Sequence, residues 1–148
     1  MSKFIQALLS GVFFTYFIDF FFFLGIKQNY FEKLEIPIYY NVLFADNQNA
    51  IIFFALTFII GLSVIYLNSR LIKLTLVGTL FIVGASTNIS SLGYMVGEKL
   101  FMTKESSLKN KKHTFVGDIY YKGREGIYFY DRELDKLIIL SYKELLND

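Results

Sequence analysis

The chain alternates long apolar runs with short polar interruptions over its first two thirds. The apolar runs cover residues 4–26, 50–67 and 74–96. Each is close to the roughly 20 residues that a helix needs to cross the hydrocarbon of a bilayer. The pattern therefore predicts an α-helical integral membrane protein, with three transmembrane helices within residues 1–97.

The segments between these runs are predicted as connections. Residues 27–49 mix charged and amide side chains with aromatic rings, which favour the headgroup level, so an amphipathic loop on the membrane surface is expected. Residues 68–70 form a tight turn, so the second and third spans are predicted to be an antiparallel hairpin. The first run resembles a secretory signal, but it is longer than a signal's apolar core and lacks an Ala-x-Ala exit, so it is predicted to stay uncleaved.

The composition changes from residue 98 onward. Residues 98–113 are predicted to be a basic linker and residues 114–148 a small β-rich extramembrane tail. Alternation and turn residues predict strands at 114–121, 127–130 and 136–142, which would form an antiparallel β meander. A sheet this small is near the limit of independent stability, so it is expected to need a membrane face, a partner chain or self-association.

The linker lysines bear on both lipid contact and orientation. Five lysines are candidates for contact with anionic lipid, although a simply solvated linker explains them equally well: Lys99, Lys104, Lys109, Lys111 and Lys112. Three spans would place them on the side of the first loop and opposite the N-terminus. The positive-inside rule then predicts a cytoplasmic tail in a bacterial inner membrane, whereas the basic turn at residues 68–73 argues for the opposite orientation.

A carboxylate, Asp19, interrupts the first span. Ala7, Gly11, Thr15 and Asp19 recur every four residues and make a small-residue ridge that suits helix packing. At about 100° per residue, five phenylalanines fall on the opposite half of the helix, which is predicted to face lipid: Phe13, Phe14, Phe17, Phe20 and Phe21.

The third span is rich in small and polar residues, as is typical of helices that contact other protein. Gly84, Gly93 and Gly97 are predicted packing positions. Counting depth from the loop end of each span places Asp19, Thr57 and Asn88 at one level, so we expect them to be near neighbours. The predicted intramembrane polar cluster consists of Asp19, Thr15, Thr57, Thr87, Asn88 and Ser91.

Two interpretations of that cluster remain open. It could lock the bundle through hydrogen bonds or pair with a basic group on a partner protein, or Asp19 could bind a proton or cation. Because three helices rarely enclose a pore, conduction would require an oligomer.

Composition removes several other functions. The chain has no cysteine and one histidine, His113, so thiol chemistry and a clustered zinc or haem site are not expected. A net charge of +2 gives no reason to expect nucleic acid. Gly123 and Gly126 lie in a predicted hairpin turn and lack the following helix of a phosphate site. No metal, cofactor or catalytic constellation is therefore predicted.

These patterns together predict a non-enzymatic accessory, assembly or scaffolding subunit of a larger bacterial inner-membrane complex. The expected partners are membrane lipids and other integral membrane proteins, in a hetero- or homo-oligomer. One alternative is a small oligomeric ion channel that uses Asp19. Another is a membrane immunity protein against a pore-forming toxin.

Overall fold

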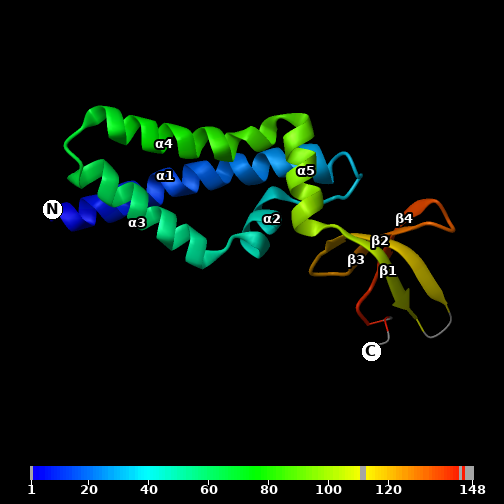
Figure 1. Cartoon of the computed structure of the whole chain (residues 1–148). Helices are drawn as coiled ribbons and strands as arrows, with labels where there is room; N and C mark the ends of the chain where they lie inside the picture. The colour runs from blue at the N-terminus through cyan, green and yellow to red at the C-terminus, as the bar shows by residue number, and fades with distance from the viewer. Residues whose placement is uncertain (1, 111–112, 144, 146–148) are drawn as a thin grey trace. The chain divides into compact units, whose positions relative to one another are not determined.

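The computed structural model describes residues 2–110, 113–143 and 145. The chain divides into two compact units, one ending at Tyr94 and one beginning at Met95. The first unit is helical and the second carries a four-stranded antiparallel sheet (Figure 1).

Two helices of the first unit are long and apolar enough to cross a membrane. Helix α1 spans Lys3–Ile26 and continues as a π-helical segment, η1, over Lys27–Phe31. Helix α4 spans Arg70–Ala85 and continues as a 3-10 turn, η2, over Ser86–Asn88. Serine side chains accept backbone N–H bonds at the start of α1 and of α4, as N-cap residues commonly do.

A third candidate crossing is broken. Helix α2 spans Tyr40–Asn47, helix α3 spans Ala50–Tyr66, and the two are bent by 87° at the break between them. The described residues therefore contain two candidate spans, or three if this bent pair counts as one. The predicted loop over residues 27–49 is wrong in part, because η1 and α2 make much of it helical.

The predicted third span over residues 74–96 is also corrected. Ile89 has an extended backbone, which ends the first helical stretch, and a separate helix, α5, runs from Ser90–Phe101. The hydroxyl of Ser86 donates to the carbonyl of Val83, and such local side-chain bonds compete with regular helix. The candidate span consequently ends at Asn88, and Gly93 and Gly97 lie beyond it in α5.

Helix α1 is the central element of the helical unit, with α3 and α4 on either side (Figure 1). Glycines show the directions of the helices. Gly11 lies against Thr57 and Gly61 against Ala7, so α3 runs antiparallel to α1. Gly84 lies against Ile18, while Thr87 lies further along against the carbonyl of Phe22, so α4 runs parallel to α1.

The described part of the second unit has one more strand than the three predicted. The strands are β1 (Thr103–Lys109), β2 (Thr114–Lys122), β3 (Ile127–Asp131) and β4 (Lys136–Leu140). They form an antiparallel meander in the order β1-β2-β3-β4. The predicted linker over residues 98–113 is therefore wrong for most of its length. Strand β1 was not predicted because its sequence, TKESSLK, is mostly polar, as is common in edge strands.

One face of the sheet carries the core of this unit. Ile119, Ile127, Phe129 and Leu140 are buried together. Four partly buried side chains pack around them: Leu108, Phe115, Ile138 and Leu145. A bridge between Asn110 and Leu145 brings Leu145 beside the end of β1.

Candidate functional site

The contact between α1 and α3 is a close approach of two backbones. A Cβ added at Gly11 would lie 2.0 Å from the carbonyl oxygen of Thr57, and one at Gly61 would lie 2.1 Å from that of Ala7. No real side chain could occupy such positions without moving a backbone. The predicted packing residues Ala7 and Gly11 are thus placed in contact with α3, where small residues allow helices to approach closely in lipid.

Two threonine hydroxyls are buried at this contact without a partner. Thr15 and Thr57 are both 0% exposed, and neither Oγ1 atom has a hydrogen-bond partner. A buried hydroxyl without a partner destabilises the folded state, since it has lost its bonds to water. The α1–α3 contact is therefore held by packing and not by these side-chain hydrogen bonds.

Asp19 lies beside the break between α2 and α3. The side-chain amide of Gln48 donates to Asp19 Oδ2 over 2.9 Å. Tyr40, on α2, packs on Phe20 with ring centroids 5.3 Å apart. The carboxylate is therefore held within the chain itself, by a residue that the sequence prediction did not include.

The predicted grouping of Asp19, Thr57 and Asn88 is wrong. Thr57 faces Gly11, two turns or about 12 Å along α1 from Asp19. Asn88 bonds to the carbonyl of Phe21. The error arose from treating residues 27–49 as a loop, because α2 covers the end of α1 and α3 begins opposite Asp19.

Thr87 and Asn88 form a separate group of interhelical hydrogen bonds, between η2 and the end of α1. The Thr87 hydroxyl donates to the carbonyl of Phe22 over 2.9 Å, and the Asn88 amide donates to that of Phe21 over 3.0 Å. Asn29, in η1, donates to the carbonyl of Thr87 over 3.0 Å. All three side chains thus donate hydrogen bonds to backbone carbonyls of another element.

Glycines make this second contact possible. A Cβ at Gly25 would lie 2.4 Å from Thr87 Oγ1, and one at Gly93 would lie 2.1 Å from the Thr87 carbonyl oxygen. Gly84 meets Ile18, and Gly97 is buried in the second unit. Ser91, by contrast, is exposed.

The phenylalanine half of α1 does not face outward uniformly. Phe13 is 64% exposed and suits a lipid-facing position. Phe17 and Phe21 contact Phe81 of α4, with ring centroids 5.6 and 5.3 Å apart. Helix α4 thus packs against part of the predicted lipid face, because the periodicity of one helix does not reveal where neighbours pack.

The predicted lipid-contacting lysines fall on different elements. Lys99 lies in the last turn of α5, while Lys104 and Lys109 lie on β1. Lys104 pairs with Glu98 over 2.5 Å. Lys111 and Lys112 lie outside the described residues.

A carboxylate in the sheet, Asp118, joins three segments. Its Oδ1 accepts the backbone N–H of Glu105 and the guanidinium of Arg132, both over 2.8 Å. Partial burial opposes ionisation of Asp118, but these two hydrogen bonds and the nearby positive charges outweigh it and lower its pKa below the ordinary value of 3.8. Glu105 has a φ of 54° at an irregularity in the β1–β2 register, so Asp118 supports a strained turn of the edge strand.

The structure supports one coarse classification: a protein with candidate membrane-spanning helices and a small antiparallel sheet. Among the described residues, no three His, Asp or Glu side chains gather into a group that could hold a metal ion. The chain matches no protein-family model, no curated protein and no solved structure.

Proposed function

We propose that this chain is a multi-pass membrane protein that serves, without enzymatic activity, as an accessory, assembly or scaffolding subunit of a larger complex in a bacterial inner membrane. The observation that carries the proposal is how polar groups of the helical unit are used. Asp19 accepts from Gln48, while Thr87 and Asn88 donate to backbone carbonyls of α1. These bonds fix the positions of helices, which a scaffold requires.

The directions of the helices support three crossings. Two helices that cross a membrane in parallel require the chain to return between them, and α1 and α4 are parallel. Helix α3 is 17 residues long and so about 25 Å, slightly short of a hydrocarbon core of about 30 Å. The 87° bend turns α2 across the end of α3 near Asp19, so the return crossing rests on α3 itself.

Three crossings place the sheet unit on the side opposite the N-terminus, and the lysine distribution favours the cytoplasm for it. A reporter that is active only in the cytoplasm, fused after Asp148, tests this orientation. Activity at that site, and none for a fusion before Lys3, is the expected result. The reverse pattern would contradict the orientation, and activity at both sites would contradict three crossings.

The sheet offers a surface for a partner. Strand β4 is an outermost strand, and its Ile139 is 58% exposed. An edge strand with an exposed apolar side chain is suited to pairing with a strand of another chain. This surface supports a role in assembly.

The experiment that tests the role is isolation of the protein at native abundance in a mild detergent, followed by native gel electrophoresis and mass spectrometry. We expect a complex larger than the monomer that dissociates in Ile139→Lys, since a charge at the edge blocks strand pairing. Val116→Lys is the matched control, because Val116 is also exposed, at 46%, but lies in the inner strand β2. A monomer in the unaltered chain would contradict the proposal.

A second candidate function is ion translocation by an oligomer. The observation in its favour is the break between α2 and α3 beside Asp19, since broken membrane helices with a carboxylate form ion sites in transporters. Proton or sodium flux into liposomes that contain the purified chain, abolished in Asp19→Asn, would support it. Absence of flux across a pH series would reject it and leave the scaffold proposal intact.

A further inference from the structure

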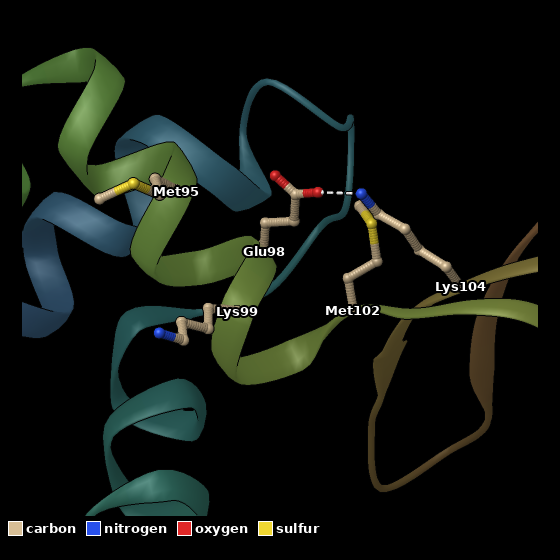
Figure 2. A pocket seen from close by; sticks show the side chains of 5 residues that line it. All are labelled: Met95, Glu98, Lys99, Met102 and Lys104. Atoms are coloured by element: carbon tan, nitrogen blue, oxygen red, sulfur yellow. Dashed lines mark ion pairs between the residues drawn. The ribbon is translucent and has the colours of Figure 1, made fainter.

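The two outer strands of the sheet present different edges, and β1 has features that discourage pairing with another strand. Its sequence, TKESSLK, is mostly polar, and its register with β2 is irregular where Glu105 has a φ of 54°. Near its start, Lys104 pairs with Glu98 of α5 beside a shallow pocket (Figure 2). Charged side chains and irregular register are common means of protecting a sheet edge, so β1 is a protected edge.

Strand β4 presents an edge of the opposite kind. Its sequence, KLIIL, carries one charge, at the first residue, and its register with β3 is regular over five residue pairs. Ile139 is exposed, as are Leu134 and Tyr142, which lie two residues beyond the two ends of the strand. After β4 the chain runs toward β1, where Leu145 bridges to Asn110. A regular edge with exposed apolar side chains is open to a further strand.

The side chains of β4 alternate between two faces of the sheet. Ile138 and Leu140 contribute to the core on one face. Leu137 and Ile139 therefore point to the opposite face, which we call the outer face. Their neighbours on β3 are both aromatic: Tyr130 beside Leu137 and Tyr128 beside Ile139. The outer face beside the free edge is thus lined by aliphatic and aromatic side chains.

The same alternation restricts how a second copy of β4 can pair with the first. Directly opposite residues of an antiparallel pair point to the same face, so a two-fold axis must be centred on a residue. Centring it on Ile138 overlaps all five residues of the strand, which no other centre does. Leu137 then lies opposite Ile139 of the second copy. Lys136 lies opposite Leu140, and the two lysines stay at opposite ends of the pair.

We propose that β4 pairs with β4 of a second copy of this chain, antiparallel and about a two-fold axis at Ile138. The pair makes the contact between Leu137 and Ile139 twice, and each contact continues to a tyrosine of β3. The end that carries Leu134 meets the end of the second copy that carries Tyr142.

Pairing of this kind ends at two copies. The joined sheet has β1 at both of its outer edges, and both are protected. A two-fold interface uses the same surface on each copy, so β4 has no edge left for a third. This inference rests on the proposed role in assembly and names the partner at this edge.

A charge pair built into one chain tests whether the partner is a second copy. The full chain is purified in a mild detergent, with more micelles than chains, and its protein mass is measured by light scattering. We expect a dimer. Leu137→Lys and Ile139→Glu should each weaken it about tenfold or more, because each puts two charges opposite apolar side chains. The double variant Leu137→Lys/Ile139→Glu should dimerise more strongly than either, since each lysine then lies opposite a glutamate.

The double variant separates a second copy from a foreign strand. A foreign partner would meet both charges without a compensating charge, so a double variant weaker than both single variants would overturn the proposal. A monomeric unaltered chain would overturn it as well. Val116→Lys is the matched control, because Val116 is exposed but lies in the inner strand β2, and the dimer should be unchanged. An equal loss in this control would mean that association does not use the β4 edge.

Cysteine cross-linking measures the register, in a chain that has no cysteine of its own. Copies with Leu137→Cys and copies with Ile139→Cys carry different tags, are produced together and are treated with a short bis-methanethiosulfonate reagent. Links between the two kinds should exceed links within either kind, because only positions 137 and 139 lie directly opposite. Ser107→Cys, on β1, should give no linked product. Cysteine is a mild replacement, so this measurement also holds where a charged variant fails to fold.

Two results separate this inference from the proposed function. A larger complex with other chains, but without links between positions 137 and 139, contradicts the pairing of two copies alone. A linked dimer that contains no other chain at native abundance contradicts the accessory role alone. Linking at Ser107 as strong as that between 137 and 139 would overturn the assignment of β4 as the pairing edge.

Discussion

Helix α1 is held by two neighbours in opposite ways. Against α3 it offers glycine and alanine, the backbones nearly touch, and the two buried threonine hydroxyls have no partner. Against η2 the packing is also close, but Thr87 and Asn88 donate to carbonyls of α1. Polar residues in an apolar helix bundle thus do not all contribute alike to stability, since the contribution of each depends on whether an acceptor is present.

The largest effect is expected where a side chain would meet backbone. Gly61→Ala places a methyl group 2.1 Å from the carbonyl oxygen of Ala7, so α1 and α3 must separate. We expect a loss of about 3 kcal/mol in the free energy of unfolding, at the upper end for overpacking. Thermal unfolding of the purified protein in a mild detergent measures it.

Gly78→Ala is the matched control for this prediction. Gly78 is also a helical glycine, in α4, but an added Cβ meets nothing within 4 Å. This variant should be unchanged or more stable by up to about 1 kcal/mol, because alanine favours helix. Equal effects of the two substitutions would show that α1 and α3 are not in backbone contact.

A pair of isosteric substitutions separates the two contacts more finely. Thr87→Val removes a hydroxyl that donates to Phe22 and should cost about 1 kcal/mol, within the range for interhelical hydrogen bonds in membranes. Thr57→Val removes a buried hydroxyl that has no partner. It should leave stability unchanged or raise it by about 1 kcal/mol, because an unsatisfied polar group is lost.

The same unfolding assay in detergent measures both variants. We expect the two variants to change the free energy of unfolding in opposite directions, or by amounts that differ by about 1 kcal/mol. A loss in Thr57→Val as large as that in Thr87→Val would mean that the Thr57 hydroxyl has an acceptor, and the contrast between the two contacts would disappear.

The sequence predicted the apolar character of α1, α3 and α4 and the presence of a small antiparallel sheet, because hydrophobicity and alternation are local signals. The ridge of Ala7, Gly11 and Thr15 was also visible as a four-residue repeat, and the structure places all three against other protein.

The position of Asp19 relative to other helices was not predictable from the same signals. Its partner, Gln48, lies between the short helix α2 and helix α3, in a segment whose aromatic and amide residues are typical of a surface loop. Matching residues of different helices by their depth requires correct helix ends. Because α2 was not recognised, Thr57 was matched with Asp19, two turns along α1 from Gly11, which it actually faces. Strand β1 was missed for a related reason, since an edge strand that buries little carries no apolar alternation.

In the sheet unit, a charged group near water, Asp118, accepts hydrogen bonds from Glu105 and Arg132. The smallest effect on stability is expected there. The lowered pKa of Asp118 means that its carboxylate stabilises the folded sheet at pH values above the ordinary 3.8 of the unfolded chain. This contribution is lost as the pH falls through the lowered folded value, so it disappears only below about pH 4. We expect less than about 1 kcal/mol, because the side chain of the partner Arg132 is 47% exposed and exposed pairs contribute little. Amide exchange of β2 and β3 in the full chain, compared at pH 5 and pH 2.5, measures the loss.

Asp118→Asn should show a smaller change between these pH values than the unaltered chain, since it has no proton to gain. An equal change in both would mean that Asp118 does not link the sheet to pH and that its bonds to Glu105 and Arg132 add nothing to stability.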